Sequence, residues 1–241
     1  MIIGAIQMNV IKNDKEKNLC TVERLINNSV DKGTKLICFD LDDTLIRGIH
    51  SVMLPCILNG KEKEHSIIQK REELNEIDYI SADYLRAELL SGLDENKIYN
   101  RFLEIAKPLA NITETINSLH EENIKCIVVT VGPVQVAKVV SDIWGFDGYY
   151  GSQYEVVDGK FTGKILEYIR AENKVDCLVD YCQKNNIKAC ECIAVGDGST
   201  DIPVFEYCGK SIALNASEKV KNKATYSVDT DNLLDILDYI K

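Results

Sequence analysis

The sequence lacks any long hydrophobic run. None of its stretches approaches the ~20 consecutive apolar residues that a membrane-spanning helix needs. The opening residues MIIGAIQMNVIKND also lack the basic start of a signal peptide, and Gln7 interrupts their apolar stretch. We therefore expect no membrane association and a cytoplasmic location.

Positive charge is in short supply. The 241 residues include 28 Lys and Arg against 38 Asp and Glu, for a net charge of -10. This balance disfavours a nucleic-acid partner, and it requires a phosphorylated substrate to meet locally focused cations. Hydrophobic content of 45% and charged content of 27% are ordinary for a folded protein of one large or two small domains.

Cysteine motifs for metal binding are missing, although the chain has nine cysteines. No C-x-x-C pair occurs: Cys190 and Cys192 flank one residue, and Cys177 and Cys182 are five apart. Most of the others lie in apolar stretches, where free cysteine behaves as a small hydrophobic residue. We predict reduced, structural cysteines, and the three histidines form no motif with them.

Short apolar runs alternate with helical patterns, which predicts an α/β fold with a mainly parallel sheet. The expected strands are 36–39, 125–130, 192–195 and 210–214. The expected helices are 112–122, 134–144, 174–185 and 233–240.

Polar residues stand at or just beyond the ends of the first three expected strands: Asp40, Thr130 and Asp197. Ligands of open parallel sheets bind beyond the carboxyl ends of the strands, so these residues should converge on one crevice. In KLICFDLDDTL, carboxylates crowd at the end of a buried strand, where they need a cation, a proton or a chemical task. A divalent metal would serve; the simpler alternative is an Asp-rich turn that closes the strand.

Residues 46–107 differ in character, since they are charged, helical in pattern and poor in strand signals. An insertion directly after the first strand would lie over the carboxyl edge of the sheet, where it could close on a substrate and exclude water. We predict that it is a cap. The alternative is a helical subdomain with no part in the site.

Four motifs occur in chain order: Asp40-Leu41-Asp42-Asp43-Thr44, Thr130, Lys174 and Gly196-Asp197-Gly198-Ser199-Thr200-Asp201. In this order they resemble the haloacid dehalogenase superfamily of hydrolases, from about Lys35 to Lys241. Within it, VVDGKFTGKI, IAVGDGSTDIPVF and the closing NLLDILDYIK are most similar to phosphoserine phosphatases. The resemblance implies a Rossmann-like core of residues 35–45 and 108–241, with a small helical cap of the C1 type at 46–107.

The resemblance also implies the chemistry. Asp40 would attack phosphorus to give an aspartyl-phosphate, and Asp42 would act as general acid and then general base. Magnesium would be the cofactor. Its expected ligands are Asp40, the backbone carbonyl of Asp42, and Asp197, with Asp201 either a ligand through water or an orienting group. The expected phosphate-binding residues are Thr130, Gly132 and Lys174, with Lys164 as the rival for Lys174.

The substrate is expected to be a small phosphorylated metabolite. By the resemblance, Arg86 would receive a substrate carboxylate, and Thr200 takes the place of an asparagine near the substrate. Ile49 stands where the family carries a glutamate for the substrate ammonium. A phosphoserine-like acid is therefore the first candidate, and a phosphomonoester without an amino group is the alternative, as is a non-catalytic binding module that retains the fold.

Residues 1–34 form an N-terminal extension with a different resemblance. Up to Phe39, IGAIQMNVIKNDKEKNLCTVERLINNSVDKGTKLICF is similar to the opening strand, helix and second strand of the nitrilase, or carbon-nitrogen hydrolase, superfamily. Asp40 then begins the phosphatase pattern, so no nitrilase site can be assembled. The extension could be an added strand and helix, a fusion remnant or an oligomer contact.

Overall fold

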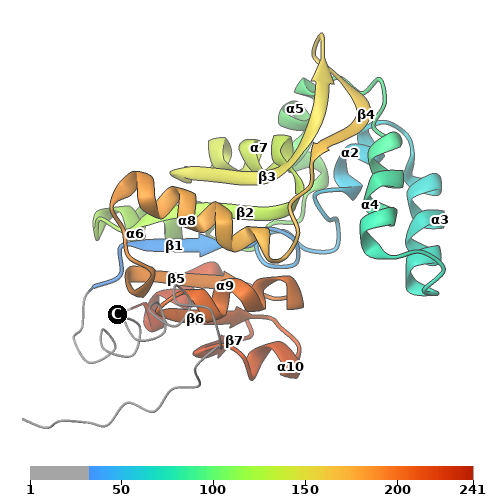
Figure 1. The fold of residues 1–241 in the computed structure, drawn as a ribbon. Coiled ribbons are helices and arrows are strands. Elements are labelled where there is room, and N and C mark those ends of the chain that lie inside the picture. Colours follow the sequence, from blue (N-terminus) through green and yellow to red (C-terminus); the bar gives the residue numbers. More distant parts are fainter. Residues whose placement is uncertain (1–32, 241) are drawn as a thin grey trace, which may run out of the picture.

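The computed structural model describes residues 33–240, and its centre is a seven-stranded sheet in the order β4-β3-β2-β1-β5-β6-β7 (Figure 1). Among these seven described strands, β3 and β4 pair antiparallel, and the other neighbouring strands pair in parallel. The strands are β1 (Leu36–Phe39), β2 (Lys125–Pro133), β3 (Gly148–Val157), β4 (Lys160–Glu167), β5 (Cys192–Gly196), β6 (Lys210–Leu214) and β7 (Tyr226–Val228). The predicted α/β fold with a mainly parallel sheet is confirmed.

The central strand β1 is buried on both faces, which explains its continuous apolar sequence. Ile37 and Phe39 point into one hydrophobic layer, and Leu36 and Cys38 point into the other. The first layer is covered by α6 (Ile112–Glu121), α7 (Val134–Trp144) and the 3-10 helix η3 (Leu233–Tyr239). The second is covered by α8 (Asn173–Asn185), α9 (Ile202–Tyr207) and α10 (Glu218–Lys221).

Five helices lie between β1 and β2, and the first four of them fall within residues 46–107. These four are α2 (Met53–Leu58), α3 (Glu62–Glu73), α4 (Tyr79–Glu88) and α5 (Asn96–Ile105). In Figure 1, α2, α3 and α4 lie beyond the carboxyl end of β1, on the side where the predicted crevice opens. Residues 46–107, which we call the insertion, are thus largely helical, and their boundaries as a separate domain stay a prediction.

The hairpin of β3 and β4 rises from the sheet and ties the insertion to it (Figure 1). Its turn residues Asp158 and Gly159 have φ of 50° and 74°, the left-handed pair that a tight two-residue hairpin turn requires. The amide of Gly92 donates to the Phe161 carbonyl at 2.8 Å, and the Phe161 amide donates to Leu93 at 2.9 Å. These bonds hold the linker between α4 and α5 against the hairpin.

The remaining elements differ from expectation in detail. Strands β1 and β6 and helix α7 have the predicted bounds, whereas β3, β4 and β7 were not predicted. Residues 233–239 form a 3-10 helix instead of an α-helix. The eight described cysteines are all free. In the described part of the chain, no helix has both the length and the apolarity to cross a membrane. The nitrilase-like segment and its proposed oligomer contact lie almost entirely outside the described residues.

Candidate active site

The parallel register of the three central strands brings the predicted residues to one edge. Phe39 pairs with Val128 on one side and with Val195 on the other. Asp40 follows Phe39 directly, Thr130 comes two residues after Val128, and Asp197 comes two residues after Val195. Since all three strands run in the same direction, their carboxyl ends present these side chains together.

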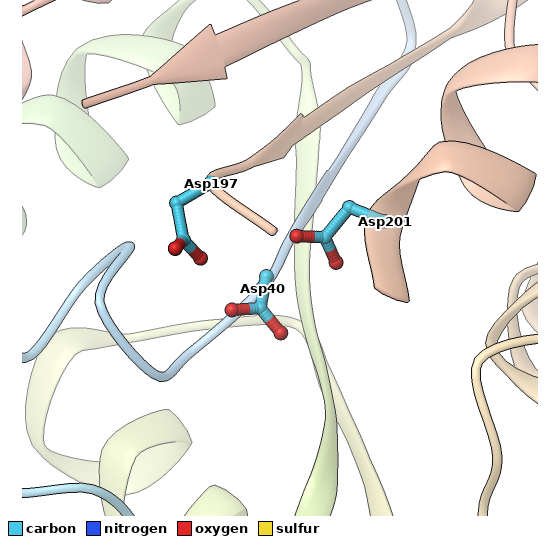
Figure 2. A group of neighbouring side chains, drawn as sticks. All are labelled: Asp40, Asp197 and Asp201. Atoms are coloured by element: carbon cyan, nitrogen blue, oxygen red, sulfur yellow. The ribbon is translucent and has the colours of Figure 1, made fainter. Parts of the chain in front are cut away.

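Three carboxylates form a compact cluster at this edge. Asp40, Asp197 and Asp201 each offer an oxygen within 4.8 Å of the others, and their side chains face a common space in Figure 2. Burial, followed by repulsion from Asp201 and Asp43, raises the pKa of Asp197 to about 6. Burial and the charge of Asp201 also raise the pKa of Asp40. The cluster is therefore short of positive charge.

Lys174 is the buried cation that faces this cluster. It lies in the first turn of α8, and its Nζ donates to Asp40 Oδ1 at 2.5 Å and to Asp201 Oδ1 at 2.7 Å. Burial alone would lower the pKa of Lys174, but the charges of Asp201 and Asp40 outweigh it and raise the pKa above its ordinary value. The rival Lys164 is exposed, and its nearest ion-pair partner is Glu155 at 4.0 Å.

The cluster fits a divalent cation on its own chemistry. One lysine against three carboxylates leaves two uncompensated negative charges in a desolvated place. Carboxylate oxygens are the hard ligands that Mg²⁺ prefers. Thr44 Oγ1 donates to Asp197 Oδ1 at 3.2 Å and so orients that carboxylate from the side of β1.

Asp42 is held apart from this cluster by Ser51, a residue that the sequence did not single out. The Ser51 amide donates to Asp42 Oδ1 at 2.5 Å, and Ser51 Oγ donates to Oδ2 at 2.6 Å. Burial raises the pKa of Asp42, although both bonds from Ser51 oppose the rise. A fixed carboxyl group with a raised pKa is suited to give and take a proton.

Replacing Ser51 with alanine is expected to reduce the kcat of the reaction catalysed at this site about tenfold. The part of the pH profile of kcat that reflects the ionisation of Asp42 should also move to higher pH. The hydroxyl favours the charged carboxylate, so its loss raises the pKa of Asp42 further, and it also frees the side chain to turn. A pH profile of kcat measures both effects. Ser66→Ala is a matched control, because the Ser66 hydroxyl bonds only its own helix. We call the two hydrogen bonds from Ser51 to Asp42 the Ser51 clamp, and an unshifted pH profile would contradict its role.

Thr130 and Gly132 line the side of Asp42. Thr130 Oγ1 accepts a hydrogen bond from the Gly132 amide at 3.0 Å and lies 3.4 Å from Asp42 Oδ2, to which it donates. A Cβ at Gly132 would lie 2.0 Å from Ser51 Oγ, so no larger residue fits beside the clamp. Asp43 instead turns outward, where its carboxylate lies 2.9 Å from His50 Nε2.

The predicted substrate residues lie at two different places. Thr200 is half-buried in the 3-10 helix η2 (Ser199–Asp201), next to the carboxylate cluster. Arg86 is buried on α4, where its guanidinium bonds Asp83 Oδ1 at 2.9 Å and Glu72 Oε2 at 2.5 Å. Ile49 is half-buried and packs against the main hydrophobic layer, so it offers no polar contact.

A buried strand end that gathers carboxylates around one lysine, with a fourth carboxylate clamped beside them, defines a hydrolase site of the phosphoryl-transfer kind. The family model for haloacid dehalogenase-like hydrolases matches residues 37–206. The chain belongs to this family, and it is a phosphatase of the phosphoserine phosphatase-like group.

The similar proteins agree with this assignment. Phosphoserine phosphatase of Saccharomyces cerevisiae is 30% identical over 214 residues, which cover 88% of this chain and 69% of that protein. Phosphoserine phosphatase of Idiomarina loihiensis is 32% identical over 208 residues, covering 86% and 93%. A solved phospho-aspartyl intermediate analogue of phosphoserine phosphatase has a TM-score of 0.72 at 28% identity and covers 87% of this chain and 100% of its own.

Proposed function

We propose that this protein hydrolyses a small phosphomonoester in two steps through an aspartyl-phosphate on Asp40, with magnesium as its cofactor. The observation that carries the proposal is that the four carboxylates fall into two separately held groups. Asp40, Asp197 and Asp201 gather around Lys174, whereas Asp42 is held separately by Ser51. One group can thus attack phosphorus while the other handles the proton.

In the first step a carboxylate oxygen of Asp40 bonds to phosphorus and the ester P–O bond breaks. Asp42, protonated at that moment, gives its proton to the departing alkoxide. In the second step water attacks the same phosphorus, its proton returns to Asp42, and the bond between phosphorus and Asp40 breaks to release inorganic phosphate. The raised pKa of Asp42 suits the first of these roles.

The other residues hold the phosphoryl group. Lys174 offsets charge on Asp40. Thr130 Oγ1 and the Gly132 amide would donate to phosphoryl oxygens in place of their present bonds to Asp42 and to Thr130. Asp40, Asp197 and Asp201 would hold Mg²⁺, with the backbone carbonyl of Asp42. When bound, the ion supplies positive charge that orients and neutralises the phosphoryl oxygens.

Phosphoserine is the first candidate substrate, because the similar proteins bear that activity in their names and Arg86 provides a buried guanidinium in the insertion. Ile49 supports a second candidate, a phosphomonoester that carries a carboxylate and no amino group. Its side chain is apolar and packs into the core, so it cannot receive an ammonium.

A panel of phosphoserine, 3-phosphooxypropanoate and phosphoethanolamine tests the proposal. 3-Phosphooxypropanoate lacks only the amino group of phosphoserine, and phosphoethanolamine lacks only the carboxylate. We expect phosphate release that requires Mg²⁺ and stops with a chelator, with phosphoserine having the highest kcat/KM. A higher value for 3-phosphooxypropanoate would favour the second candidate. Absence of release from every phosphomonoester in the presence of Mg²⁺ would refute the proposed function.

A further inference from the structure

Tyr154 is a buried tyrosine whose hydroxyl has no hydrogen-bond partner among residues 33–240. It lies on β3, and its side chain is only 4% exposed. Its backbone is well held, since Gln135 Nε2 donates to the Tyr154 carbonyl at 2.9 Å. A buried hydroxyl without an acceptor is costly, and buried tyrosines usually find one. Packing alone would be served as well by phenylalanine.

The surroundings of Tyr154 place it between the catalytic edge and the insertion. After burial, the groups that act on its pKa are Asp83, Cys56, Arg86 and Asp42, and together they raise that pKa well above its ordinary value. The hydroxyl therefore keeps its proton and can donate. Asp83, Arg86 and Cys56 belong to the insertion, whereas Asp42 belongs to the site.

Arg86 supplies a second buried donor without an acceptor. Both Nη atoms bond carboxylates, but its Nε–H has no partner among the described residues. Asp83 accepts from Arg86 Nη1 at 2.9 Å and from Tyr168 Oη at 2.5 Å, but it bonds neither Tyr154 Oη nor Arg86 Nε. The buried Oε1 of Gln135 is likewise unpartnered, so it does not reach Tyr154 Oη. Among residues 33–240 neither donor has an acceptor.

We propose that Tyr154 is a specificity-determining residue whose hydroxyl donates, together with Arg86 Nε–H, to a carboxylate on the leaving group of the substrate. This inference rests on the proposed function. A carboxylate offers two strong acceptor oxygens, which match two separate donors. Hydrogen bonds to this charged acceptor would offset the free-energy cost of burying both donors away from water. The hydroxyl thereby links recognition by the insertion to the sheet that carries Asp42.

The test is Tyr154→Phe, which removes one oxygen and keeps the ring. For phosphoserine, KM is expected to rise about tenfold, the loss of a hydrogen bond to a charged group, with a smaller change in kcat. For phosphoethanolamine, which has no carboxylate, KM should not change. The melting temperature of the substrate-free variant should be equal or higher, because an unpaired buried hydroxyl has been removed.

Tyr150→Phe is the matched control on the same strand. Tyr150 Oη donates to Asp180 at 2.8 Å, so its hydroxyl already has a partner within the protein. This variant should keep the ratio of the two KM values. An equal rise in KM for both substrates in Tyr154→Phe, or a lower melting temperature with an unchanged ratio, would overturn the inference.

Binding separates this inference from the proposed function. Calorimetry of phosphoserine and phosphoethanolamine with Asp40→Asn, alone and combined with Tyr154→Phe, needs no turnover. A selective tenfold loss of phosphoserine affinity in the double variant supports the role of Tyr154, whether or not the wild type releases phosphate. Absence of phosphate release by the wild type would refute only the proposed reaction. Equal affinities in the single and double variants would overturn the role of Tyr154.

Discussion

Asp40→Asn is expected to lower kcat by about 10⁴-fold or more, the scale of effect seen when a covalent nucleophile is removed. Asp40 lies at the carboxyl end of the central strand, buried, with Oδ1 2.5 Å from Lys174 Nζ. The amide is nearly the same size but cannot form the phosphoryl bond. Steady-state phosphate release with Mg²⁺ measures the loss.

The same variant should fold as well as the wild type. Asparagine removes one charge from a cluster in which repulsion from Asp201 raises the pKa of Asp40, and Lys174 keeps Asp201 as its partner. The melting temperature without metal is therefore expected to be unchanged or higher. Asp43→Asn is the control, since Asp43 pairs with His50 outside the cluster, and its kcat should stay within about threefold of wild type. Phosphate release by Asp40→Asn at the wild-type rate would remove Asp40 from the mechanism.

Lys174→Met is expected to damage both stability and activity. Removing one member of a buried ion pair costs about 3–5 kcal/mol of unfolding free energy, because Asp40 and Asp201 lose their shared cation. We expect kcat to fall about 10³-fold through the loss of charge stabilisation at the phosphoryl group. Denaturant unfolding and phosphate release measure the two effects.

The loss of unfolding free energy in Lys174→Met is expected to depend on pH, and the direction of that dependence follows from the pKa shifts. The raised pKa of Lys174 means that its stabilising contribution is present below the ordinary lysine pKa and is lost as pH rises through the folded value. Lys174 also opposes the rise in the pKa of Asp40, so its removal favours protonated Asp40. The difference in unfolding free energy between wild type and Lys174→Met should thus be smaller near pH 4 than at pH 7, as denaturant unfolding at the two pH values would measure. Added Mg²⁺ should recover part of the loss.

Lys164→Met provides the comparison for this prediction. Its side chain is 74% exposed and has only a long contact with Glu155, so unfolding free energy should change by less than about 0.5 kcal/mol. If Lys174→Met lost no more unfolding free energy than Lys164→Met, the buried ion pairs of Lys174 would not contribute substantially to the stability of the protein.

Elements with strong local patterns were predictable. Strands β1 and β6 have the expected bounds because buried parallel strands are short, continuous apolar runs that end in polar residues. The hairpin of β3 and β4 was missed, although Asp158-Gly159 is a strong hairpin signal in the sequence. Strand β7 has only three residues, and its pairing with β6 is a tertiary contact that no local pattern announces.

The sequence by itself determined which residue types stand at the ends of the strands, and therefore the reaction that we propose. Asp40 and Asp197 follow buried strands and Thr130 lies in the last part of another, and the parallel order of those strands is a consequence of alternating local patterns. The catalytic roles of these residues stay predictions, but their convergence follows from chain direction alone.

Only the tertiary structure decided which side chains touch. It placed Lys174 against Asp40, brought Ser51 to Asp42 and bound Arg86 to two acids of the insertion. It also left the Tyr154 hydroxyl without a hydrogen-bond partner among residues 33–240. Most of these contacts join residues from separate elements: Lys174 reaches Asp40 from α8, and Ser51 reaches Asp42 from the start of the insertion. Spacing along a chain encodes local periodicity, whereas a hydrogen bond depends on positions in space to a fraction of an ångström.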